Sequence, residues 1–199
     1  MKVTKEQAEQ NRLALLEAAA QLFKQHGVDG VGVADICRQA GLTHGALYKH
    51  FSDKQDLAAQ AFSHAFDAGH ARASGAQAGK APSLERYLRN YLSPQVRDDP
   101  VAGCPLVATA CETGRQGEGL SQSFAAGFLA LREGLAATLA TAGPTGDRQA
   151  LASVYVAALV GAMALSRGVA KADPVLADEV LAQVHAVLGA WPAAAADGE

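Results

Sequence analysis

Apolar residues recur along this chain at the three- and four-residue spacing of amphipathic helices. In residues 4–26 they place Leu15, Ala19, Leu22 and Phe23 on one face. Similar patterns, separated by glycine, proline and serine, predict further helices. These cover residues 52–73, 84–96, 105–113, 120–142, 147–171 and 174–190, with two short helices within residues 33–51. The chain is therefore predicted to be all-α, with about nine helices.

Composition supports the same fold class. The 199 residues include 44 alanines and 22 leucines but one isoleucine and seven threonines. Alanine and leucine favour helices, whereas strands favour the β-branched and aromatic residues that are scarce here.

Residues 33–51 have the pattern of two short helices that cross steeply over a tight turn. Gly41 allows the turn, and Thr43 is a suitable N-cap for the second helix. The inner sides are predicted to carry Ile36, Cys37, Ala40, Leu47 and Phe51. This arrangement is a helix-turn-helix, whose second helix enters the major groove of DNA in proteins that use it.

The motif and its flanks stand in one fixed order. They are residues 15–23, Gly27, Asp35-Ile36, Ala40-Gly41-Leu42, residues 47–54 and Leu57. In this respect the chain resembles the TetR/AcrR family of bacterial transcriptional regulators over roughly its first 57 residues, and beyond them only in size and helical character. Gly32 stands where the family usually has a threonine or serine cap, a role that glycine fills at slightly lower stability.

The resemblance implies an N-terminal three-helix DNA-binding domain over residues 1–52. A helical ligand-sensing and dimerisation domain would cover residues 53–191, followed by a disordered tail at residues 192–199. It also implies a repressor that an effector releases from a palindromic operator in double-stranded DNA. A helical adaptor, or a small-molecule-binding protein that does not act through DNA, is the alternative.

The DNA-binding prediction rests on seven side chains in and after the second helix. Thr43, His44 and Gly45 are expected to contact bases, as the resemblance also implies; Tyr48, His50 and Lys54 are expected to contact phosphates, and Lys49 could do either. Gly45 lacks a Cβ and would let the helix approach the bases closely. Lys54 opens the next helix, where backbone N–H groups could help to hold a phosphate.

Charge limits the mode of DNA binding. The net charge is −3, and residues 1–56 hold seven Lys/Arg against seven Asp/Glu. A strongly cationic, nonspecific binder is excluded, and two copies acting together would compensate for weak local basicity. Three cysteines do not make a disulfide framework, residues 154–165 are too short an apolar run to span a bilayer, and no signal-peptide pattern occurs. We therefore expect a cytoplasmic protein.

Two kinds of sensor are predicted for the effector. Cys104 and Cys111 lie seven residues apart, and Cys104 precedes a helix whose N-terminus would favour a thiolate. Residues 103–106 also resemble a segment of electrophile- and oxidant-sensing family members. The other kind is an apolar pocket lined by Phe66, Tyr87, Tyr91, Phe124, Phe128 and Tyr155. In both cases the alternative is that these residues simply pack in the core.

The last two predicted helices offer a homodimer interface. Residues 147–171 are apolar on almost every side and residues 174–190 carry an apolar stripe, so two copies could form a four-helix bundle. The alternative is that both stripes close the core of a monomer. No metal, cofactor or enzymatic activity is expected, because no zinc-ligand spacing, nucleophile elbow, phosphate-binding loop or dinucleotide motif occurs.

Overall fold

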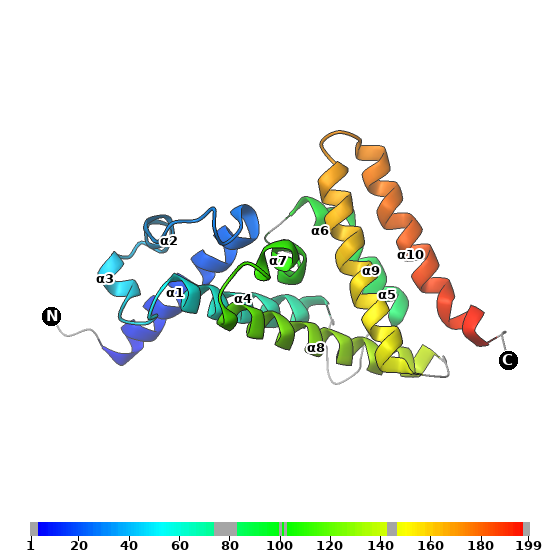
Figure 1. The fold of residues 1–199 in the computed structure, drawn as a ribbon, viewed down its shortest axis with the longest axis horizontal. Helices are drawn as coiled ribbons and strands as arrows, with labels where there is room; N and C mark the ends of the chain where they lie inside the picture. Colours follow the sequence, from blue (N-terminus) through cyan, green and yellow to red (C-terminus); the bar gives the residue numbers. More distant parts are fainter. Residues whose placement is uncertain (1–3, 74–82, 100, 102, 143–146, 197–199) are drawn as a thin grey trace. The chain divides into compact units, whose positions relative to one another are not determined.

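A computed structural model of the chain describes residues 4–73, 83–99, 101, 103–142 and 147–196. Within these ranges it consists of helices and connecting turns without a strand, so the all-α prediction is confirmed (Figure 1). The helices are α1 (Lys5–His26), α2 (Val33–Ala40), α3 (His44–Leu47), α4 (Lys54–Ala73), α5 (Leu84–Tyr91), α6 (Pro94–Asp98), α7 (Pro105–Thr113), α8 (Glu118–Ala142), α9 (Arg148–Val169) and α10 (Pro174–Ala196).

The chain divides into two compact units. The first unit comprises Met1–Ala68 with Cys104–Ala126, and the second comprises Gly69–Gly103 with Gly127–Glu199. Helices α4 and α8 each continue from one unit into the other. This division differs from the predicted boundary between residues 52 and 53, because α7 and the start of α8 belong with the predicted DNA-binding helices. The domain boundary itself stays a prediction.

The first unit closes around leucine, isoleucine and phenylalanine side chains of its short helices. Its fully or almost fully buried residues include Leu15 of α1, Ile36 of α2, Leu47 of α3, Leu57 of α4, Leu106 of α7 and Leu120 of α8. The inner positions predicted for the helix pair are confirmed for Ile36, Cys37, Leu47 and Phe51, each at most 2% exposed. Apolar burial of this kind is the main stabilising term for such a unit.

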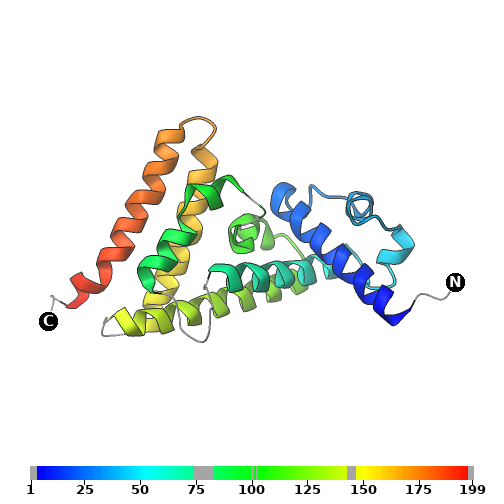
Figure 2. The ribbon, with the colours of Figure 1, turned by 180° about the vertical axis from the view of Figure 1, so that it is seen from behind.

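The second unit is built on α9 and α10, which lie side by side in both views (Figure 2). Helix α5 packs against α10, and α6 packs against α9. Two buried hydroxyl groups link the long pair: Ser166 donates to the carbonyl of Ala177 at 2.8 Å, and Tyr155 donates to the carbonyl of Leu188 at 2.6 Å.

The second of these bonds lies four residues before Pro192 of α10. In an unbroken helix the carbonyl of Leu188 would accept the N–H of residue 192, but Pro192 has none. The Tyr155 hydroxyl takes its place. Helix α10 continues to Ala196, beyond the predicted helix end at residue 190, and the disordered tail at residues 192–199 stays a prediction. Residues 197–199 lie outside the described part of the chain.

A second correction concerns residues 84–96, predicted as one helix. The structure has α5 and α6 instead, which is why ten helices are described rather than about nine. Ser93, in an extended conformation, separates them and caps α6 by accepting the N–H of Val96 at 3.3 Å. Pro94 causes the break, because proline disfavours a helical conformation of the residue before it. Arg167 of α9 then donates to the carbonyls of Val96 and Arg97.

Helix α9 is long and apolar enough to cross a membrane by length and composition alone, with a mean hydropathy of 1.7 over an 18-residue window. A buried helix of a globular core meets the same criterion. Here α9 packs against α10, and its residues Tyr155, Leu159 and Met163 are almost completely buried. Packing within the second unit therefore accounts for part of its apolar character, with 39% of that window buried.

Candidate DNA-binding site and sensor segment

The turn between α2 and α3 has the conformation that the sequence predicts. Gly41 adopts the left-handed region with φ 67° and ends α2, where its N–H donates to the carbonyl of Arg38 at 3.2 Å. Leu42 then donates to Cys37 at 2.9 Å, and Thr43 caps α3 by accepting the N–H of Ala46 at 3.3 Å. The turn is therefore held by its own backbone and by one hydroxyl.

Gly32 begins α2 without a side-chain cap. Its backbone is extended, and its N–H donates to Oδ2 of Asp35 at 3.2 Å, which is the half of a capping box that glycine can make. The other oxygen of Asp35 pairs with Arg38 at 3.0 Å. The departure from the usual family residue at this position is thus compensated locally.

Helix α3 presents a polar outer surface. Thr43, His44, Gly45, Tyr48 and Lys49 are exposed, with 56% of Tyr48 accessible. Leu47 is completely buried and fixes the orientation of the helix. Regular α-helix covers only His44–Leu47, and hydrogen bonds from His50 and Phe51 to the carbonyl of Leu47 continue the coil as tight turns.

The remaining two predicted DNA contacts are less accessible. His50 and Lys54 are half-buried, and the His50 ring lies beside Phe51. Lys54 has acidic neighbours: Asp53 accepts the N–H of Asp56 at 2.8 Å, and Asp56 accepts the N–H of Ser52 at 3.0 Å. Hydrogen bonds from Gln60 and Ser52 hold the pKa of Asp56 below its usual value. The Ser52 N–H is therefore already engaged by an ionised carboxylate rather than directed at a phosphate.

Arg12 is a residue of the site that sequence reasoning missed. Its guanidinium lies 5.7 Å from the centre of the Phe51 ring and donates to Oε1 of Gln60 at 2.5 Å. Gln60 in turn donates to Asp56 at 2.7 Å. These contacts join α1 to the corner between α3 and α4. Nothing in the local spacing marks Arg12, because its partner Gln60 is 48 residues away.

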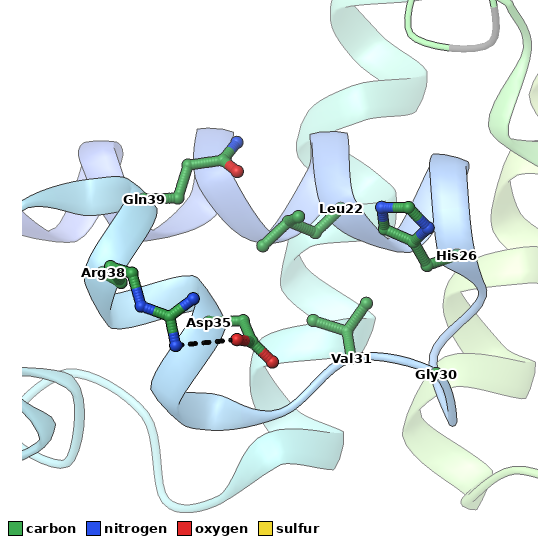
Figure 3. Close-up of a pocket in the computed structure, with 7 residues that line it drawn as sticks. All are labelled: Leu22, His26, Gly30, Val31, Asp35, Arg38 and Gln39. Carbon is green, nitrogen blue, oxygen red and sulfur yellow. Dashed lines mark ion pairs between the residues drawn. The ribbon is translucent and has the colours of Figure 1, made fainter.

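A hollow of about 510 Å³ lies beside the helix pair, between the end of α1 and α2 (Figure 3). It is lined by Leu22, His26, Gly30, Val31, Asp35, Arg38 and Gln39. The two charged groups drawn there, Asp35 and Arg38, pair with each other, and Asp35 also holds the N–H of Gly32. The charged groups of this hollow thus stabilise the N-terminus of α2.

The two candidate sensor cysteines occupy different environments on α7. Cys104 is the N-cap and is half-buried, whereas Cys111 is exposed in the last turns of the helix. The predicted helix start at Cys104-Pro105 is confirmed, with proline at the first helical position. Cys37 is buried in the first unit, and burial raises the pKa of its thiol, in keeping with a packing role.

The six predicted pocket aromatics belong to different units. Phe66 and Phe124 are in the first unit, where Phe62 lies 6.4 Å and 5.8 Å from them between ring centres. Tyr87, Tyr91, Phe128 and Tyr155 are in the second. Tyr87 stacks on Tyr91, and Tyr155 is completely buried with its hydroxyl bound to α10. Neither unit by itself brings the six together, and a ligand role stays a prediction.

Helices α9 and α10 expose several large apolar side chains. They are Val154 and Leu165 of α9 and Val175, Leu176, Val187 and Trp191 of α10, each at least 39% exposed. Where exposed apolar side chains form a large patch, the patch marks an interaction site in soluble proteins. The interface prediction thus has candidate residues on both helices.

A glycine-hinged helix pair with a polar, exposed second helix defines the class of helix-turn-helix DNA-binding proteins. The comparisons then identify the family. Residues 15–61 match the family model for bacterial regulatory proteins of the tetR family, and residues 81–178 match the model for the C-terminal domain of LmrA/YxaF-like transcriptional regulators. The chain belongs to the TetR family of DNA-binding transcriptional regulators, and the second match extends the resemblance well beyond residue 57.

Curated relatives match a short part of the chain. The HTH-type transcriptional regulator AcrR of Shigella flexneri is 44% identical over 54 residues, covering 27% of this chain and 25% of that protein. The HTH-type transcriptional repressor BepR of Brucella suis is 44% identical over 57 residues, covering 29% and 27%. These matches span about a quarter of each relative.

The fold is shared over nearly the whole chain. Escherichia coli NemR, solved in a reduced form, superposes with a TM-score of 0.71 at 22% identity, covering 87% of this chain and 94% of that one. At this identity the likeness concerns the fold alone.

Proposed function

We propose that the protein is a homodimeric repressor that binds a palindromic double-stranded DNA operator and is released by an effector. The exposed polar surface of α3, held by the buried Leu47, is the observation that carries the proposal. The bases of the operator would be contacted by Thr43, His44 and Gly45. Its phosphates would be contacted by Tyr48, His50 and Lys54, and Lys49 could contact either. The name of BepR as a repressor supports the direction of regulation.

The exposed apolar residues of α9 and α10 support a twofold dimer. Pairing these helices with those of a second copy would remove side chains such as Leu165 and Val187, 64% and 60% exposed, from water. The helix pairs α2–α3 of the two copies would then contact half-sites about 34–36 Å apart, or a multiple of that distance. Such a regulator would act in the cytoplasm, where the DNA is.

For the effector we propose modification of Cys104, with a noncovalent apolar ligand as the competing mechanism. Cys104 is half-buried at the N-terminus of α7, a position that favours the thiolate form of a cysteine. N-ethylmaleimide, to which a thiol adds across the double bond, is a suitable probe. Release of operator by this reagent from the wild type but not from Cys104→Ser supports the thiol mechanism. Equal release from both proteins contradicts it, and Cys111→Ser is the matched control.

Selection of bound duplexes from a random pool tests the function. We expect enrichment of a palindrome, and a helical adaptor would enrich no sequence. On the selected operator, Tyr48→Ala and Lys54→Ala should each weaken binding by about tenfold. Only Lys54→Ala should also reduce the slope of log Kd against log salt by about one, because the lysine carries the charge that displaces counterions from the phosphates.

Lys171→Ala is the control for lost charge, because Lys171 is exposed in the second unit. Circular dichroism should show all three variants folded, since Tyr48 is largely exposed and Lys54 is half-buried. Unchanged operator affinity in both Tyr48→Ala and Lys54→Ala would show that α3 and the start of α4 do not form the DNA-binding surface.

A further inference from the structure

The segment that follows α1 is held by a carboxylate from α7. The N–H of Val28 lies 3.1 Å from both Oε1 and Oε2 of Glu112. Val28 is 1% exposed, so this donor would have no water to bind if Glu112 moved away. Glu112 is itself half-buried, and it lies 84 residues from Val28 in the sequence.

Gly27 is shaped to admit that carboxylate. It has φ 73°, in the left-handed region, and a Cβ at this position would lie 2.8 Å from Oε2 of Glu112. The backbone conformation therefore favours glycine here, and a Cβ would displace the carboxylate of Glu112. The turn that follows α1 therefore packs around the side chain of Glu112 from α7.

The turn after α7 makes a second connection, to α4. Gln55 donates to Oε1 of Gln116 at 2.9 Å and accepts the N–H of Gly117 at 3.4 Å. Gln55 lies in the first turn of α4, directly after the helix pair. The α7 segment thus contacts the element before α2 and the element after α3, all within the first unit.

Apolar packing completes the junction. A cavity of only about 20 Å³ remains among α1, α4, α7 and α8, lined by residues that include Phe23, Val28, Phe62, Pro105, Thr109 and Leu120. Thr109 and Thr113 are buried, and their hydroxyls donate to carbonyls of α7 itself. The polar contact from α7 to the end of α1 is therefore made by Glu112 and not by these threonines.

The negative end of the α1 dipole lies at this corner, where a cation would be favoured and an anion is opposed. The Glu112 carboxylate is held there by one donor, the N–H of Val28, at 3.1 Å. Such a contact makes the conformation of the segment before α2 depend on the position of α7, because moving the carboxylate leaves the Val28 N–H unsatisfied.

We propose that Glu112 is a positioning residue for DNA binding, through which α7 sets the conformation of the helix pair. The inference rests on the proposed function and adds to it the element that regulates the site. Any modification or ligand that displaces α7 then acts on operator affinity through the Glu112–Val28 contact.

The test compares three substitutions of Glu112 by operator affinity, by thermal unfolding and by amide hydrogen exchange of a peptide that covers residues 24–31. Glu112→Ala removes the acceptor, and Glu112→Asp keeps the charge but is one methylene too short. Both should speed exchange at Val28 and weaken operator binding by about tenfold, a typical coupling effect. Glu112→Gln keeps an acceptor oxygen at the same reach and should restore both properties toward wild type.

Glu118→Ala is the matched control, because Glu118 is an exposed acid of the same unit that bonds to Gln122. It should leave exchange and affinity unchanged. Faster exchange at Val28 with unchanged operator affinity would overturn the positioning role, as would unchanged exchange in Glu112→Ala. If the wild type selects no DNA, the proposed function fails by itself, whereas the exchange measurement still reports on the contact. If Glu112→Ala does not fold, the comparison of Asp with Gln decides.

Discussion

At the scale of single residues, Tyr155 shows why an aromatic residue that sequence analysis assigns to a pocket can have another role. Its phenol is completely buried, and its hydroxyl donates to the one carbonyl of α10 that Pro192 leaves without a helical partner. Burial raises the pKa of Tyr155 to about 12, because the phenolate would be poorly solvated there. Tyr155 therefore stabilises the α9–α10 pair in its protonated form.

This pKa predicts a loss of stability in alkaline solution. Below pH 10 the phenol is protonated in the folded and unfolded chains, so its contribution is fully present. As the pH rises from 10 to about 12, the unfolded chain loses the proton first, and the contribution is lost through the folded pKa. Urea unfolding should show wild type losing roughly 2 kcal/mol more than Tyr155→Phe over this range. Parallel curves for the two proteins would contradict the assignment.

At the scale of elements, the helix pair depends on one backbone conformation and one short helix. Gly41 has φ 67° with no atom within 4 Å of the place a Cβ would occupy, so the backbone and not the space requires glycine. Gly45 lies within α3, and the nearest atom to its added Cβ is Oγ1 of Thr43 at 4.0 Å. The two glycines therefore serve different purposes.

Replacing each glycine by alanine separates these purposes. Gly41→Ala should lower the free energy of unfolding by about 1–2 kcal/mol, the cost of a left-handed conformation for a residue with a Cβ. Gly45→Ala should raise it by roughly 0.5–1 kcal/mol, because alanine favours helix. Operator affinity should fall, because the added methyl group would face the bases in the proposed complex. Urea unfolding and operator titration of both variants provide the measurement. The opposite order of stabilities would refute this account of the turn.

Local signals were sufficient for the helix pair but not for the contacts that support it. Gly41 and Thr43 act on their immediate neighbours, so their roles as turn and cap are visible in the sequence and confirmed by the structure. The break before Pro94 was missed because Val96 continues the four-residue spacing of Leu88 and Leu92 beyond the proline. Glu112 and Arg12 could not be predicted, since their partners lie 84 and 48 residues away and no local pattern encodes such pairs.

At the scale of the whole molecule, the exposed apolar side chains of α9 and α10 make dimer formation the property to test. Val187→Glu places a charge on a residue that is 60% exposed in the single chain. Burying that charge between two copies would be costly, so sedimentation equilibrium should show a monomer. Affinity for the full operator should fall by at least about tenfold, because one head binds without the other.

Leu13→Glu is the control for the dimer prediction. Leu13 is 44% exposed on α1 in the first unit, so the same type of substitution is made away from α9 and α10. It should remain a dimer. Dimeric Val187→Glu would place the interface elsewhere.

The brevity of α3 has a consequence for the genes that such a protein could control. Four residues of regular helix advance about 6 Å, less than two base-pair steps of about 3.4 Å. Each half-site of an operator would then be recognised through a few adjacent base pairs, and the sequence of the flanking base pairs would matter little. A half-site this short recurs often in a chromosome, so one copy of the protein would discriminate poorly between sites and much of the specificity would come from the second half-site and its fixed spacing.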